Sequence, residues 1–292
     1  MKQETTKRDY NEISPSAKSL LLLKGITNIP FAKECVELIC LPGKYEPDSN
    51  HKDLAYWKRV VHFENRYWSV DQLLSQLQIN NIIELSSGYS FRGLDAVKGS
   101  KIHYIDTDLL NVIEQKKEML PALLAGNGEL QGTLKMVALN ALDEIEFNAI
   151  IDSFPDGPVV IVNEGLLMYL SNTEKENLCK IIYKVLQKRG GYWITADIYI
   201  KATLERFSKE SDDHLKELVE QQKIEDNMFA SFKTAEAFFN NAGFVIEVEA
   251  TVDYGKLSSL KYLLGSATEA QLKEMQSHPN IQKTWCLKLK TT

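Results

Sequence analysis

The residues best suited to bind a ligand lie in segment 82–93, which reads IIELSSGYSFRG. The apolar run containing Glu84 is typical of a buried strand, and Gly88 follows it in a turn. Glycine lets the backbone approach a ligand closely or adopt a positive φ, and Ser86 and Ser87 add small polar groups. The turn therefore predicts a binding site at the end of a strand, although one glycine also fits an ordinary turn.

The single glycine also indicates which kind of ligand fits. A dinucleotide site needs G-x-G-x-x-G, which brings backbone amides and a helix N-terminus to a pyrophosphate. This chain has Ser86-Ser87-Gly88, followed only by Arg92-Gly93, so a ligand without phosphates is favoured. We therefore expect S-adenosylmethionine as the cofactor.

Polar side chains follow the next two predicted strands. Asp106 and Asp108, in IHYIDTDL, stand about 20 residues beyond the glycine turn, where a ribose-binding carboxylate is expected. The alternative is that Asp108 caps the helix that begins near residue 109. After the third strand, VALNALDE offers Asn140 and Ala141, which are residue types that hydrogen-bond and flank an adenine ring.

Short apolar runs must position these residues. Five of them alternate with helical segments, at 82–85, 102–106, 135–139, 159–164 and 192–197. Such runs predict a parallel sheet covered on both faces, which is a doubly wound α/β fold. The closing segments, TAEAFFNNAGFVIEVEA and KTWCLKLK, resemble the end of a class I methyltransferase sheet, whose last strand is antiparallel.

The remaining chain predicts helices around this Rossmann-like core. Helical patterns at about 15–40 and 56–78 indicate an N-terminal helical cap over residues 1–79. Residues 80–292 form the predicted core, with a charged helical lid insertion at about 200–232. Because no Pro/Gly/Ser-rich linker divides the chain, we expect cap and core to form a single structural unit.

Three motifs, IIELSSGYSFRGL, YIDTDL and VNEGLLMYLS, together resemble the leucine carboxyl methyltransferase family, over about residues 15–200. That family includes protein C-terminal carboxyl methyltransferases and bacterial O-methyltransferases of the polyketide type. In its pattern, Gly88 matches the cofactor-turn glycine, Asp108 the ribose carboxylate and Asn140 the adenine-side residue. The chain departs from it at Ser86, where the family usually has glycine, and at Asn140, where it usually has Asp.

The resemblance implies roles for further residues. Arg66 matches the arginine that holds the methionine carboxylate of the cofactor, with Arg59 as a nearby alternative. Glu164 matches the strand-four acid that closes the cofactor pocket. Lys18 looks like a cap lysine that contacts the cofactor or its surroundings, although a solvated lysine on the first helix fits equally well.

The implied activity is methyl transfer from S-adenosylmethionine to a carboxylate or hydroxyl of a small molecule. A carboxylate acceptor needs no general base, whereas a hydroxyl acceptor requires one. Among the five histidines, His62 is the best candidate, because it lies near Arg66, but it also fits an ordinary helix histidine. Tyr169 and Tyr89 either line the acceptor pocket or pack in the core.

Composition argues against several other classes of function and partner. With 34 Lys+Arg against 40 Asp+Glu, the net charge of −6 argues against nucleic acid as a partner. Four cysteines without a C-x-x-C pair indicate reduced thiols in a cytoplasmic protein rather than a metal site. No apolar run has the roughly 18 residues of a membrane span. The alternatives are a non-catalytic cofactor- or metabolite-binding protein on this fold and a protein carboxyl methyltransferase; the missing motif disfavours a nicotinamide oxidoreductase.

Overall fold

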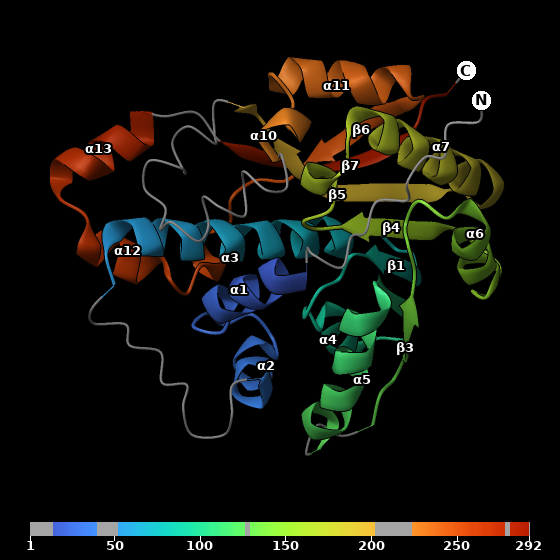
Figure 1. The fold of residues 1–292 in the computed structure, drawn as a ribbon, viewed down its shortest axis with the longest axis horizontal. Helices are drawn as coiled ribbons and strands as arrows, with labels where there is room; N and C mark the ends of the chain where they lie inside the picture. The colour runs from blue at the N-terminus through green and yellow to red at the C-terminus, as the bar shows by residue number, and fades with distance from the viewer. Residues whose placement is uncertain (1–13, 40–51, 126–128, 202–223, 278–280, 292) are drawn as a thin grey trace, which may run out of the picture.

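Seven strands form one sheet in the order β3-β2-β1-β4-β5-β7-β6. In this computed structural model, residues 14–39, 52–125, 129–201, 224–277 and 281–291 are described (Figure 1). The strands are β1 (Asn81–Leu85), β2 (His103–Asp108), β3 (Thr133–Ala138), β4 (Val159–Asn163), β5 (Gly191–Tyr199), β6 (Phe244–Glu249) and β7 (Gln282–Leu289). Strands β1 to β5 pair in parallel, and β7 lies antiparallel between β5 and β6. The predicted doubly wound sheet with an antiparallel last strand is confirmed.

Helices cover both faces of the sheet, as the continuous apolar strands require. Every residue of β1 and β4 is buried. Along β1, Ile83 points into the core formed with α6 (Glu144–Asp152), α7 (Asn172–Arg189) and α11 (Phe232–Asn241). Its neighbour Ile82 points to the opposite face, where it packs with α3 (Leu54–Ser75) and α4 (Arg92–Gly99). This alternation places Glu84 on the same face as Ile82.

The N-terminal helical region consists of α1 (Ser14–Lys24), α2 (Ala32–Ile39) and α3. The stretch predicted at about 15–40 is therefore two helices. Gly25 ends the first, where an added Cβ would lie 2.5 Å from Val36 Cγ2, and Phe31 at φ 63° prevents a continuous helix. A buried cluster joins α1 and α2 to α5 (Leu110–Leu124), so the cap packs directly on the core.

Helix α3 connects this cap to the sheet. Near its C-terminus, Val70 and Leu73 pack against the sheet face. Near its N-terminus, Trp57 and Val60 pack instead with residues of α1 and α12 (Leu260–Ser266). Figure 1 shows α12 and α13 (Glu269–Ser277) at the end of α3 that lies away from the sheet. The predicted division at residue 79 stays a prediction.

The other elements are short. They are the 3₁₀ turns η2 (Leu167–Tyr169) and η3 (Tyr254–Lys256) and the helix α10 (Ile224–Asn227). Most of the predicted lid, residues 202–223, lies outside the described residues, so the lid stays a prediction. Among the described helices, none combines the length and apolar character needed to cross a membrane. Three of the four cysteines, Cys35, Cys179 and Cys286, are buried thiols.

The turn between α7 and β5 gives a test of this packing. Gly191 has φ 111°, and an added Cβ would lie 1.9 Å from the Val159 carbonyl oxygen. Gly191→Ala should therefore lower the free energy of unfolding by about 3 kcal/mol or more, because backbone must move. Gly99→Ala is the matched control, since nothing lies within 4 Å of its added Cβ, and it should change stability by less than about 1 kcal/mol. Urea denaturation measures both; equal effects would contradict the described packing.

Candidate functional site

The turn after β1 has the backbone shape that a glycine-rich turn would give. Both Ser86 and Gly88 have φ 52°, in the left-handed region. The Ser87 amide donates to the Thr107 carbonyl at 2.9 Å, which ties the turn to β2. The serine at the first family glycine therefore leaves the predicted turn conformation in place.

The two aspartates of β2 have different surroundings. Asp106 is fully buried, and one of its oxygens lies 2.8 Å from Lys116 Nζ, which also donates to Ser87. Asp108, at the end of the strand, accepts from the Gly88 amide and from the Leu109 amide, each at 2.7 Å. Burial raises the pKa of Asp108 against the opposing effect of these two amides. Of the two, Asp108 is therefore placed beside the turn where a ligand would lie.

The predicted adenine-side residues follow β3. Asn140 is half-buried, and its side-chain oxygen accepts from the Leu142 amide at 3.1 Å. Ala141 is buried in the core on the same face as Leu139. Their contact with a ligand stays a prediction.

Three cations converge on Glu164, the residue directly after β4. Lys24 Nζ lies 2.6 Å from Oε1, Arg66 Nε lies 3.2 Å from Oε1, and Arg92 Nη2 lies 2.7 Å from Oε2. All four side chains are buried. Burial alone would raise the pKa of Glu164, but the three cations outweigh it and hold this pKa well below its usual range. Burial lowers the pKa of Lys24.

Arg92 is held from several sides. Its Nε lies 2.7 Å from Asp71 Oδ1, and its Nη1 pairs with Glu84. Tyr104 donates to the other Glu84 oxygen at 2.6 Å. Glu84 belongs to the segment expected to bind the cofactor, but it is 1% exposed and its side chain pairs with Arg92. Its direct contact with a cofactor stays a prediction, while its contacts with Arg92 and Tyr104 are what the structure describes.

Asp197 near the end of β5 fixes the backbone that carries Glu164. Its carboxylate accepts from the amides of Gly165, Leu166 and Leu167 at 2.6, 2.7 and 3.1 Å. Asn163 Nδ2 donates to it at 2.6 Å. Gly165 has φ 93°, and an added Cβ would lie 3.4 Å from Arg66 Nη2, so a glycine suits this position beside Arg66.

A histidine–tyrosine pair extends this site toward β5. Arg66 Nη1 donates to Tyr199 Oη at 3.2 Å, and Tyr199 Oη lies 2.7 Å from His62 Nε2. Burial, together with the charge of Arg66, lowers the pKa of His62 to about 3. Burial raises the pKa of Tyr199 to about 12. Near neutral pH the tyrosine therefore keeps its proton and shares a hydrogen bond with an uncharged imidazole.

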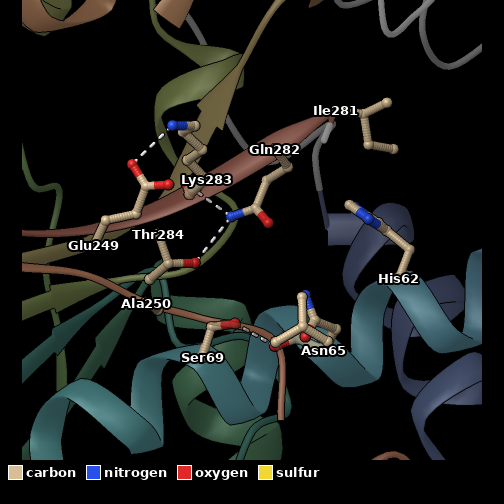
Figure 2. A pocket seen from close by; sticks show the side chains of 10 residues that line it. His62, Asn65, Ser69, Glu249, Ala250, Ile281, Gln282, Lys283 and Thr284 are labelled. Carbon is tan, nitrogen blue, oxygen red and sulfur yellow. Dashed lines mark hydrogen bonds and ion pairs between the residues drawn. The ribbon is translucent and has the colours of Figure 1, made fainter. Parts of the chain in front are cut away.

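A polar cavity of about 110 Å³ lies next to His62 (Figure 2). It is bordered by α3, by the end of β6 with the loop after it, and by the start of β7, and it is partly open to solvent. Its lining residues are His62, Asn65, Ser69, Glu249, Ala250, Val252, Ile281, Gln282, Lys283 and Thr284.

The other predicted site residues lie farther from these contacts. Lys18 is exposed on α1, whereas Lys24, six residues later on that helix, reaches Glu164. Arg59 lies two turns before Arg66 on α3, and its buried Nε has no hydrogen-bond partner among the described residues. Tyr169 is half-buried in η2. Roles for Lys18 and Tyr169 at the site stay predictions.

Sequence reasoning missed four residues of this site: Lys24, Arg92, Asp197 and Tyr199. One signal was available for Lys24, because a lysine that ends the apolar run LLLL is a candidate for burial beside an acid. A signal was also available for Arg92, because it follows the glycine turn directly in the segment expected to bind the ligand. The two β5 residues carried none, since only the sheet order places β5 beside β4.

Comparisons with known proteins support the fold. No family model and no curated protein matches the sequence. A DUF574 family protein from Streptomyces avermitilis is similar, with 14% identity, coverage of 94% of this chain and 97% of that chain, and a TM-score of 0.53. The magnesium protoporphyrin IX methyltransferase of Synechocystis, with bound SAH, has 7% identity, coverage of 90% and 96%, and a TM-score of 0.49.

A third similar structure is a LepI variant in complex with SAH and a substrate analogue. It has 10% identity and a TM-score of 0.43, and the match covers 74% of this chain but only 44% of that chain. Likeness at these identities concerns the fold. The strand order with its antiparallel last strand is that of the class I methyltransferase fold, and the match to the DUF574 family protein supports the same α/β architecture. Membership of the leucine carboxyl methyltransferase family stays a prediction.

The serine in the left-handed turn gives a stability test. A side chain at φ 52° is strained, and glycine relieves that strain at the expense of a more flexible unfolded chain. Ser86→Gly should therefore raise the free energy of unfolding by up to about 1 kcal/mol. Gly88→Ala, at the same φ, should lower it by about 1 kcal/mol or more. Thermal or urea unfolding distinguishes the two, and a destabilised Ser86→Gly protein would contradict the assigned turn.

The low pKa of His62 predicts a specific titration. Because its folded pKa of about 3 lies below the ordinary 6.5, the unfolded chain binds more protons between those values. The stabilisation from this group is therefore full above about pH 6.5 and is lost as the pH falls toward 3. NMR of the assigned imidazole should show no titration between about pH 5 and 8. A midpoint near 6.5 would contradict the described His62 environment.

Proposed function

We propose that the protein binds S-adenosylmethionine across the carboxyl ends of β1, β2 and β4 and transfers its methyl group to an oxygen of a small molecule. The observation that carries this proposal is the charge cluster on Glu164, which lies at the end of the strand next to β1. When bound, this cofactor supplies an electrophilic methyl group on a sulfonium.

The cluster suits the amino-acid end of that cofactor. Three cations and three carboxylates make it neutral in sum, but its charges are separated in space. A zwitterion fits such a cluster: Lys24 and Arg66 would hold its carboxylate, and Glu164 would accept from its ammonium group. The arginine fork favours a carboxylate through charge-assisted hydrogen bonds.

The nucleoside end fits the neighbouring turn. Asp108 lies beside the left-handed turn at Gly88, where its carboxylate would accept the ribose hydroxyls. Asn140 follows the next strand and would contact the adenine. An amide can still pair with the adenine amino group through its carbonyl oxygen. These assignments follow the resemblance to the leucine carboxyl methyltransferase family, which also favours transfer to oxygen.

The alternative is a protein that binds the cofactor without methyl transfer. Its motivation lies in Ser86 and Asn140, which depart from the family pattern. The turn nevertheless keeps left-handed residues at both family positions, which supports cofactor binding in either case. A screen with methyl-labelled cofactor separates the two functions, because only the transferase passes label to a carboxyl or hydroxyl compound.

Calorimetry with S-adenosylhomocysteine tests the proposed site. The wild-type protein should bind it, and Arg66→Gln should weaken binding by roughly 10- to 100-fold, the effect of losing charge-assisted hydrogen bonds. Arg66→Lys keeps the charge and should show a smaller loss. Lys184→Met is the control, since Lys184 pairs with Glu144 at the surface, and it should leave binding within about twofold.

Two results would contradict this proposal in different ways. Absence of binding by the folded wild-type protein would overturn cofactor binding altogether. Unchanged affinity in folded Arg66→Gln protein would overturn the role of Arg66 alone. Circular dichroism of each variant shows whether the buried cluster still lets the chain fold.

A further inference from the structure

The polar cavity beside His62 lies at the same sheet edge as the proposed cofactor site. Gln282, the first residue of β7, pairs with Tyr199 at the end of β5, and Glu249 ends β6. All three positions belong to the edge where the parallel strands have their carboxyl ends. In open α/β sheets, ligands bind outside this edge. The cavity is therefore in a place where a second ligand can meet the first.

A chain of contacts links the cavity to the Glu164 cluster. His62 lines the cavity, and its Nε2 lies 2.7 Å from Tyr199 Oη. Tyr199 in turn accepts from Arg66, which contacts Glu164. Three successive contacts, His62–Tyr199, Tyr199–Arg66 and Arg66–Glu164, therefore connect the cavity wall to the proposed site for the amino-acid end of the cofactor.

The lining offers hydrogen bonds rather than net charge. Asn65, Ser69 and Thr284 are uncharged, and His62 is neutral near physiological pH. The cavity's one lysine among the described residues, Lys283, lies 2.9 Å from Glu249, so their charges compensate each other. A carboxylate placed here would lose its hydration without gaining an uncommitted cation, which is unfavourable.

Gln282 presents a fixed acceptor to this space. Its Nε2 donates to the Ala196 carbonyl and the Lys283 carbonyl at 2.8 Å each, and to Thr284 Oγ1 at 3.0 Å. These contacts orient the amide so that its oxygen is turned away from the strand. Figure 2 shows this oxygen on the side of Gln282 that faces His62, with Asn65 and then Ser69 following His62 along α3 below the cavity. A preoriented amide oxygen suits a hydroxyl or amide donor.

Resting on the proposed function, we propose that this cavity binds the methyl acceptor and selects a neutral small molecule that carries hydroxyl or amide groups. Gln282 and Asn65 are then the residues that determine specificity. Tyr199 positions the His62 side chain that lines the cavity. Of the two acceptor chemistries implied by the sequence, a hydroxyl compound is favoured over a carboxylic acid. The new oxygen–methyl bond would form as the methyl–sulfur bond breaks, and the hydroxyl proton would pass to the Glu249 carboxylate that lines the cavity. A volume of about 110 Å³ admits a group of several non-hydrogen atoms, because a water molecule occupies about 30 Å³ in the liquid.

Lactamide and lactate form a matched pair of probes, since they share a skeleton and a hydroxyl but differ in charge. Saturation-transfer NMR is recorded with each at millimolar concentration and with saturating S-adenosylhomocysteine. The wild-type protein should give signals for lactamide and much weaker signals for lactate. Asn65→Leu should weaken lactamide binding by about fivefold, the effect of one lost hydrogen bond.

Asn65→Lys tests the charge argument in the opposite direction. An added ammonium in the cavity should turn the preference toward lactate. Ser75→Ala is the matched control, because Ser75 is exposed on the last turn of the same helix, and it should leave both probes unchanged. Calorimetry with S-adenosylhomocysteine on each variant keeps the two proposals distinguishable, since these substitutions lie outside the Glu164 cluster.

The outcomes decide the proposal. Lactamide selectivity in the wild-type protein, its loss in Asn65→Leu and its reversal in Asn65→Lys support it. Equal or stronger binding of lactate to the wild-type protein, no binding of either probe, or an unchanged Asn65→Leu protein would overturn it. A protein that fails to bind S-adenosylhomocysteine but still selects lactamide would refute the proposed function and leave the cavity's selectivity standing.

Discussion

The contact of three cations with Glu164 is the constraint on which the site depends. Lys24 comes from α1, Arg66 from α3 and Arg92 from α4, while Glu164 follows β4. A buried carboxylate is strongly destabilising unless its charge is balanced, so these four elements must dock in one arrangement. The neighbouring acceptors on Arg92 and the amides on Asp197 then fix the cluster's position on the sheet. The helical cap and the core therefore meet at this charge as well as through their apolar contacts.

Helix α3 also connects segments from distant parts of the chain. Helix α3 packs on the sheet at one end and on α1 and α12 at the other. Glu64 in the middle of this helix accepts from the backbone and side chains of Ser258 and Ser259, nearly 200 residues later. Chain segments far apart in sequence thus converge on α3, which also carries Arg66 and His62. A rigid helix with these attachments can hold both side chains at fixed distances from β5.

Local sequence patterns predicted the strands and the turn because those features depend on neighbouring residues. Apolar runs identified the strands, and the glycine after the first of them identified the turn at Gly88. The partners of Glu164 were only partly predictable, since Lys24 is 140 residues away and meets it through the topology. Ser86 shows a further limit: the sequence showed a missing glycine, but only the backbone shows that the turn's conformation survives.

The ion pairs that Glu164 makes with Lys24 and Arg66 lower the protein's affinity for an acidic ligand. Without a ligand, the protein's own carboxylate already holds the two cations, Lys24 and Arg66, that an incoming acid would need. An acidic ligand therefore competes with an internal anion whose effective concentration is high and which cannot diffuse away. Binding becomes an exchange of partners rather than a net gain of ion pairs. Such exchange limits how tightly any acid is retained, and it favours release of a spent ligand over its accumulation.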